Sequence, residues 1–161
     1  MNWAHVHLLL NHLPLYGAIA GAVLLGLSLA MKRQALGRAG LTVIVVTAFV
    51  AGAVYLTGEP AEEQVESLLG VSESFIERHE EMALRAVIAL AAVGLFAVYG
   101  LVVLRRRPSP RTLALAFILS LLPLGAMAYT AYLGGQIRHS EIRAPAEGER
   151  NGAQPEPRPA L

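Results

Sequence analysis

Residues 82–104 read MALRAVIALAAVGLFAVYGLVVL, a long apolar stretch in which Arg85 is the one charged residue. The hydrocarbon core of a bilayer is about 30 Å thick and a helix rises about 1.5 Å per residue, so about 20 such residues cross it. The apolar run stops at Arg105, where three arginines and a proline follow one another. Residues 82–104 therefore predict a transmembrane helix.

Three further stretches have a similar length and apolar character, and charged or helix-breaking residues bound each of them: 13–31, 39–57 and 112–133. We expect the first stretch to be a retained span rather than a cleaved signal, because its basic residues follow the apolar run. The chain of 161 residues is 55% hydrophobic and 16% charged, against about 45–50% and about 25% in soluble domains. The sequence predicts an all-α polytopic membrane protein, with a four-helix transmembrane bundle over residues 1–143 and a disordered tail over residues 144–161.

Small residues recur at four-residue spacing in the first span, as Gly17–Gly21 and Ala22–Gly26. In lipid, such pairs let two helix backbones approach closely. We expect them to pack against other helices of the same bundle rather than to form a dimer.

Loop charge predicts the orientation, since short basic loops stay in the cytoplasm. Residues 32–38 carry three basic side chains and residues 105–111 carry four, with no acid in either loop. Residues 58–81 hold eight glutamates and one arginine. We therefore expect a bacterial inner membrane protein with both termini and the acidic loop in the periplasm.

The acidic loop also contains a helical pattern. Apolar or small side chains fall at helical spacing, and His79 ends the series: Val65, Leu68, Leu69, Ser72, Phe75 and Ile76. Gly70 is expected to interrupt this pattern, and Ser74 with Glu77 forms a capping box for a new helix start. The sequence predicts a short amphipathic periplasmic helix between spans 2 and 3, followed by a third span that begins near Ser74. An amphipathic segment lying on the bilayer is the alternative.

Composition and motifs exclude several classes of function. The absence of cysteine removes disulfides, thiolate metal sites, iron–sulfur clusters and covalently attached haem. The net charge of +1 favours no nucleic-acid partner. No nucleophile–base motif or phosphate loop is present, so we do not expect a stand-alone enzyme.

Histidine is the chemistry-bearing residue that remains. All five copies fall on the predicted outer side: His5, His7, His12, His79 and His139. Three of them lie within a turn or two of one membrane plane, on three different segments: His12, His79 and His139. They could equally be interfacial side chains bonded to backbone or water.

Imidazoles at one depth favour a b-type haem, since a bis-histidine haem takes two rings from different helices. The candidate pairs set His7 or His12 opposite His79 or His139. Arginines at this depth could meet the haem propionates, namely Arg78, Arg85 and Arg138. For Arg85 an ordinary pair with Glu81, four residues earlier, is the simpler interpretation.

A copper, iron or zinc ion is the alternative cofactor, with His12, His79 and His139 as its ligands. Glutamates could complete such a set, although a solvated face explains them more simply: Glu59, Glu62, Glu63 and Glu80.

The order of these features resembles a bacterial membrane family, domain of unknown function 2231. The shared elements are H-x4-H-x-P at residues 7–14, Thr57-Gly58, His79, and Gly134-Gly135 with a following histidine, His139. The resemblance covers roughly residues 5–143. It implies a four-span fold with a histidine-rich outer face.

These observations predict an integral membrane protein that binds b-type haem or a metal at its periplasmic face, as an electron-transfer component. Its partners would be the lipid bilayer and redox or membrane-complex proteins. Two alternatives remain: a cofactor-free interaction or assembly subunit of a larger membrane complex, and a metal-handling or sensing protein.

Overall fold

The computed structural model of the chain describes residues 2–65, 73–139 and 142–143. In these ranges the regular elements are six α-helices: α1 (Trp3–Leu10), α2 (Leu13–Met31), α3 (Gln34–Tyr55), α4 (Gly58–Val65), α5 (Glu73–Arg106) and α6 (Pro110–Arg138). The predicted disordered tail, residues 144–161, lies outside the described residues. The all-α prediction is confirmed.

Four helical segments are long and apolar enough to cross a membrane: Trp3–Met31, Gln34–Gln64, Glu73–Arg106 and Pro110–Ile137. They contain the four predicted spans and extend beyond them, because helical hydrogen bonds continue past the apolar stretch. α5 begins at Glu73, as the capping pattern near Ser74 predicts. A short helix, α4, does lie between spans 2 and 3, but it covers Gly58–Val65 and shares only Val65 with the expected pattern. The residues that would continue that pattern to the expected break at Gly70 lie outside the described part.

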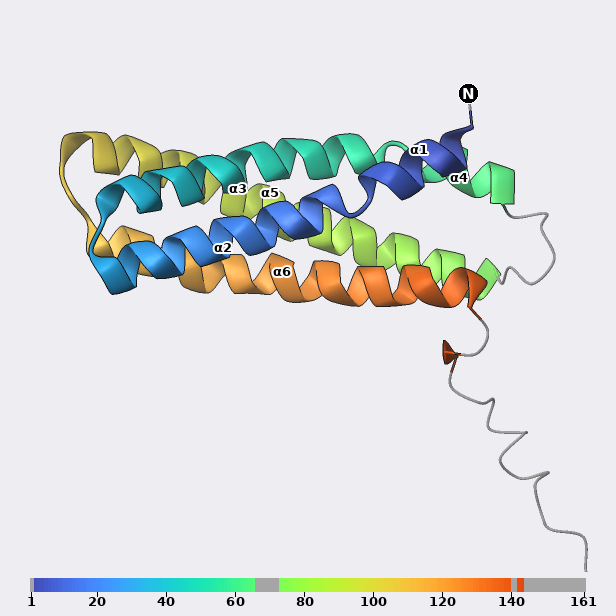
Figure 1. The fold of residues 1–161 in the computed structure, drawn as a ribbon. Helices are drawn as coiled ribbons and strands as arrows, with labels where there is room; N and C mark the ends of the chain where they lie inside the picture. Colours follow the sequence, from blue (N-terminus) through green and yellow to red (C-terminus); the bar gives the residue numbers. More distant parts are fainter. Residues whose placement is uncertain (1, 66–72, 140–141, 144–161) are drawn as a thin grey trace, which may run out of the picture.

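The four long helices form a closed ring in which each packs against two others (Figure 1). α2 packs against α3, α3 against α5, α5 against α6, and α6 returns to α2. The short connections at residues 32–33 and 107–109 lie at one end of this bundle. We call this the basic end. The other end holds α1, α4, the first turns of α5 and the last turns of α6, and we call it the histidine end.

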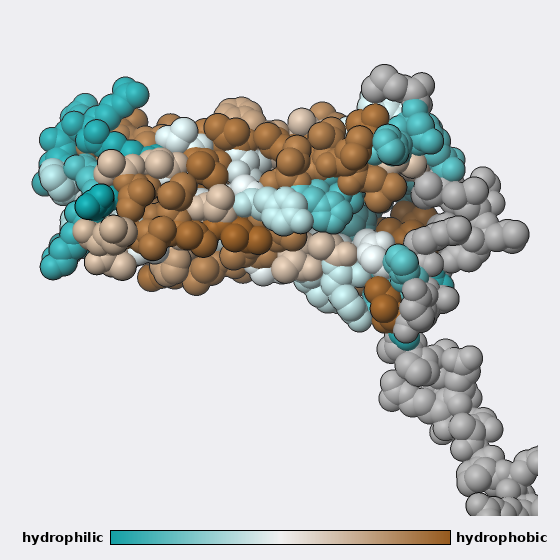
Figure 2. Space-filling model, viewed as in Figure 1, coloured by the Kyte–Doolittle hydropathy of each residue, from teal (hydrophilic) through white to brown (hydrophobic). Residues whose placement is uncertain are grey.

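The bundle interior is built largely from small and aliphatic side chains in two clusters. Toward the basic end, Leu25, Leu41 and Ile44 pack with the facing side of α5 and α6. Toward the histidine end, Ala18, Ala51, Ala86, Leu90 and Met127 form the second cluster. Large apolar side chains point outward instead, such as Phe49, Leu95 and Leu122, which are 70–78% exposed. Figure 2 shows hydrophobic side chains over most of the length of the bundle and hydrophilic side chains at its ends, with one hydrophilic patch between them on the visible face. A mostly hydrophobic surface of this kind suits contact with lipid.

Glycines set the contact between α2 and α3. A Cβ added at Gly21 would lie 2.6 Å from Ile44 Cγ1, and one added at Gly17 would overlap the Thr47 side chain. The four-residue spacing of small residues therefore serves packing inside the bundle, as predicted.

A break separates α1 from α2 at Asn11 and His12. Pro14 causes it, because a proline lacks the N–H that would bond four residues back and its ring crowds the Leu10 carbonyl. The sequence places the start of the first helix at residue 13 and leaves α1 unrecognised. α1 packs against α4 across the histidine end, and the Ala4 N–H donates to Gln64 Oε1 at 3.2 Å.

Candidate functional site

The imidazole of His7 on α1 is held by Thr57, in the turn between α3 and α4, and through it by Val54 near the end of α3. Its Nδ1 lies 2.8 Å from Thr57 Oγ1, and the same hydroxyl lies 2.6 Å from the Val54 carbonyl oxygen. A hydroxyl has one hydrogen, and a carbonyl oxygen only accepts, so the Thr57 hydrogen goes to Val54. Thr57 Oγ1 then accepts the hydrogen of His7 Nδ1. The neutral ring keeps its Nε2 lone pair available.

The imidazole of His79 on α5 is held in the same tautomer from α6. Its Nδ1 lies 2.9 Å from the Thr130 carbonyl oxygen, which only accepts, so Nδ1 carries the hydrogen. Gly134 makes room for the ring, because a Cβ added there would lie 3.0 Å from His79 Cε1. His79 Nε2 is therefore the nitrogen with a free lone pair.

The structure holds both of these rings at the histidine end, on two different helices. His7 lies on α1 and His79 in the first turns of α5, and both side chains are half-buried. Each ring has its Nδ1 hydrogen bonded to the protein and its Nε2 left as a potential ligand. Metal-binding histidines have this arrangement, in which a hydrogen bond to the second nitrogen fixes the tautomer and the ring orientation.

The other histidines are placed differently. His12 is exposed just before α2 and stacks on Tyr16 with ring centroids 6.3 Å apart. His139 is exposed at the end of α6, and His5 is exposed on α1. Within the described ranges, no three His, Asp or Glu side chains gather closely enough to hold a metal ion, so His12, His79 and His139 do not form one ligand set.

Arg78 and Arg85 line a groove between α5 and α6. The groove has a volume of about 150 Å³, and its other lining residues are Glu81, Met82, Tyr129 and Leu133. Arg85 Nη2 lies 3.1 Å from Glu81 Oε2, and both side chains are about two-thirds exposed, at 67% and 68%. The expected i,i+4 pair is thus confirmed, and such an exposed pair contributes about 0.2–1 kcal/mol. The third candidate arginine, Arg138, has a side chain that lies outside the described part of the structure.

The four candidate glutamates line a second, open hollow of about 290 Å³: Glu59, Glu62 and Glu63 on α4 and Glu80 on α5. Three of them are exposed and Glu62 is half-buried. The group is a hydrated acidic surface beside α4.

Three polar groups of the site have no role in the sequence-based prediction. Thr57 and Thr130 orient the two rings, and the resemblance marks the first only as part of a Thr-Gly pair. Asn11 is the third, since its Oδ1 is buried and has no hydrogen-bond partner among the described residues. It lies four residues after His7, hence on the same face of that helix. Spacing to His7 was the available signal for Asn11, whereas the carbonyl of Thr130 carries none.

A search with this chain finds no matching family model, no matching curated protein and no matching solved structure.

Proposed function

We propose that this protein binds a b-type haem through His7 and His79 at the histidine end and serves as an electron-transfer component of the membrane. The observation that carries the proposal is the pair of Nδ1 contacts, at 2.8 Å to Thr57 Oγ1 and at 2.9 Å to the Thr130 carbonyl oxygen. Thr57 and the Thr130 carbonyl each accept an Nδ1 hydrogen, which leaves two neutral Nε2 ligands on different helices. Haem supplies one-electron redox chemistry when its iron is held by such axial ligands.

The number of protein ligands favours haem over a bare metal ion. A zinc or copper ion takes most of its ligands from side chains, three or four in the usual sites. A porphyrin brings four nitrogens of its own, so its iron would need only two ligands from the chain. The imidazoles of His7 and His79 are two such ligands.

An optical spectrum of the purified full-length chain tests this function. After expression with a haem supply, we expect about one haem per chain and sharp absorption bands that shift on reduction with dithionite. A chain that is folded by size-exclusion chromatography but takes up no haem, from cells or on reconstitution, would contradict the proposal. The interaction-subunit class would then account better for the protein.

We also propose that the histidine end faces the periplasm of a bacterial inner membrane. The basic end carries Lys32 and Arg33 between α2 and α3, Arg38 in the first turns of α3, and Arg105–Arg107 at the end of α5. Short basic connections of this kind remain in the cytoplasm. A reporter that is active only in the cytoplasm should be silent when fused after Leu161 and active when inserted after Arg107. The reverse pattern would place the two imidazoles on the cytoplasmic face.

A further inference from the structure

The groove between α5 and α6 combines two cations with an apolar floor. Arg78 and Arg85 lie seven residues apart on α5, which is about two helical turns along one side of the helix. Met82 and Leu133 line the groove between the two helices, and Tyr129 lies beside them. Two arginines against one glutamate give the lining a net charge of +1.

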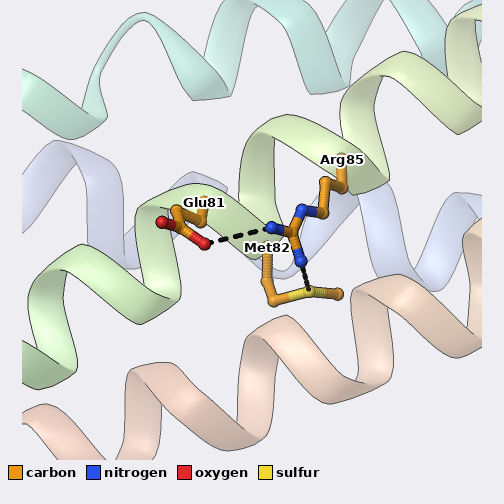
Figure 3. A network of polar contacts seen from close by, with 3 residues as sticks. All are labelled: Glu81, Met82 and Arg85. Carbon is orange, nitrogen blue, oxygen red and sulfur yellow. Dashed lines mark hydrogen bonds and ion pairs between the residues drawn. The ribbon is translucent and has the colours of Figure 1, made fainter.

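The two arginines of this groove are available to bind an anion from outside the chain. Figure 3 shows the Arg85 guanidinium between the Glu81 carboxylate and the Met82 sulfur, at 3.1 Å and 3.8 Å. Both members of the ion pair are largely exposed, so solvent screens the pair and it can open at little cost. Arg78 is exposed, and no hydrogen bond or ion pair of its side chain is found among the described residues.

Two aromatic rings place the groove at the depth of lipid headgroups. Tyr129 and Tyr132 are about half exposed and stack with centroids 6.2 Å apart on the flank of α6. Tyrosines at the ends of transmembrane helices lie at the membrane–water interface. Arg85, near the start of the apolar part of α5, therefore lies where lipid phosphates lie.

An apolar surface continues from the groove toward the middle of the membrane. One turn inward from Tyr129 on α6, Gly125 leaves open space, since a Cβ added there would meet nothing within 4 Å. Leu122 on the same helix is 70% exposed, and Ile88, one turn inward from Arg85 on α5, is 60% exposed. Such a surface suits an acyl chain that hangs from a headgroup held above it.

We propose that the groove between α5 and α6 binds the phosphate of an anionic phospholipid, with Arg78 and Arg85 as its cationic ligands. Arginine suits this role because its planar guanidinium bonds two phosphate oxygens at once. Glu81 gives up Arg85 to the phosphate when the lipid binds. The acidic hollow of Glu59, Glu62, Glu63 and Glu80 repels the same headgroup, so the anionic lipid is directed to the α5–α6 side. The proposal is independent of haem binding.

The test uses the full-length chain with a fluorescent reporter beside the groove. Trp3→Phe removes the one tryptophan of the chain, and Tyr132→Trp places a new one next to Tyr129. The protein is reconstituted in phosphatidylcholine vesicles with a minor share of phosphatidylglycerol, and bromine on the acyl chains of one lipid quenches nearby tryptophan. We expect brominated phosphatidylglycerol to quench well above its share of the bilayer.

Variants of Arg78 and Arg85 test whether these two side chains cause the preference for phosphatidylglycerol. R78Q/R85Q in the reporter background should reduce the enrichment of phosphatidylglycerol by about fivefold per arginine, and Glu81→Gln should increase it. The matched control R105Q/R106Q removes two arginines from the basic end of the same helix and should leave the quenching unchanged. All variants are compared only after they elute as the parent does on size-exclusion chromatography.

Two results would overturn the proposal. The first is an unchanged lipid preference in R78Q/R85Q, and a lower haem content in the same variant would then assign the two arginines to haem propionates. The second is an equal reduction of the preference in the control R105Q/R106Q, which would identify an effect of net charge and not of this groove.

Discussion

Replacing Gly40 by leucine should strongly destabilise the four-helix bundle. A Cβ at Gly40 would lie 3.1 Å from the backbone oxygen of Gly21, and also 3.1 Å from Leu24 Cβ and Leu25 Cγ. A backbone oxygen and a Cβ cannot turn aside as the tip of a long side chain can, so α2 and α3 must separate. Overpacking of this kind costs about 3 kcal/mol at the upper end of its usual range. Size-exclusion chromatography and thermal unfolding in detergent measure the loss.

A matched control lies on the same helix. A Cβ added at Gly52 would meet nothing within 4 Å, so Gly52→Ala and Gly52→Leu should leave elution and unfolding temperature close to those of the parent. Gly40→Ala should fall between the parent and Gly40→Leu. If both leucine variants behave alike, the approach of α2 and α3 at Gly40 is not what holds the bundle together.

Replacing either His7 or His79 by alanine should remove the proposed haem. Each ring supplies one of two iron ligands, so each single variant should retain little haem and the double variant should be no worse. Mutation of a residue that hydrogen-bonds to a metal ligand typically lowers metal affinity roughly 10–100-fold. Removal of the ligand itself should lower haem affinity by more than that. Haem content per chain and the reduced-minus-oxidised spectrum are the measurements. His5→Ala, His12→Ala and His139→Ala are the controls, because these rings are exposed, and a loss confined to His12→Ala would refute the assignment of His7.

Thr57 separates ligation from simple packing at the same site. Thr57→Val keeps the volume but removes the oxygen that accepts from His7 Nδ1, so haem affinity should fall about 10–100-fold. Thr57→Ser keeps that oxygen and should bind as the parent does. Equal affinity in Thr57→Val and Thr57→Ser would show that the hydroxyl does not orient the ligand.

The architecture of this protein follows from its sequence because a bilayer imposes a length on apolar helices. Runs such as residues 82–104 and 112–133 identify their helices with no further information. The spacing of Gly17 and Gly21 predicted a close contact with another helix. Only the structure shows that this helix is α3 and that Gly40 lies against Gly21. Helix ends were less accessible, since the N–H groups of the first turns are satisfied by local caps, such as Asn2 accepting from His5 N and Ser109 accepting from Thr112 N.

The sequence predicted the membrane depth of the candidate histidines but not the direction in which their side chains point. Sequence position places His12 and His79 at one level of the membrane, and His7 about a turn further out. Residues 7 and 12 are five apart, however, so on one continuous α-helix their side chains would point about 140° apart. Only one of them can face His79 from a single helix face. Local structure decides between them, because the break before Pro14 turns His12 outward beside Tyr16 while α1 carries His7 to Thr57.

The ring order α2–α3–α5–α6 also bears on how this protein is made. Consecutive spans are neighbours, and each of the two short basic connections joins an adjacent pair. The chain is thus two antiparallel hairpins, each with its positive turn on the same side. A translocation channel can release such a chain into lipid one hairpin at a time, and the second hairpin then docks on a first that has already closed its own contact at Gly21 and Gly40. Each span can therefore pack against the span next to it in the sequence, and none has to wait in the membrane for a partner that is synthesised much later.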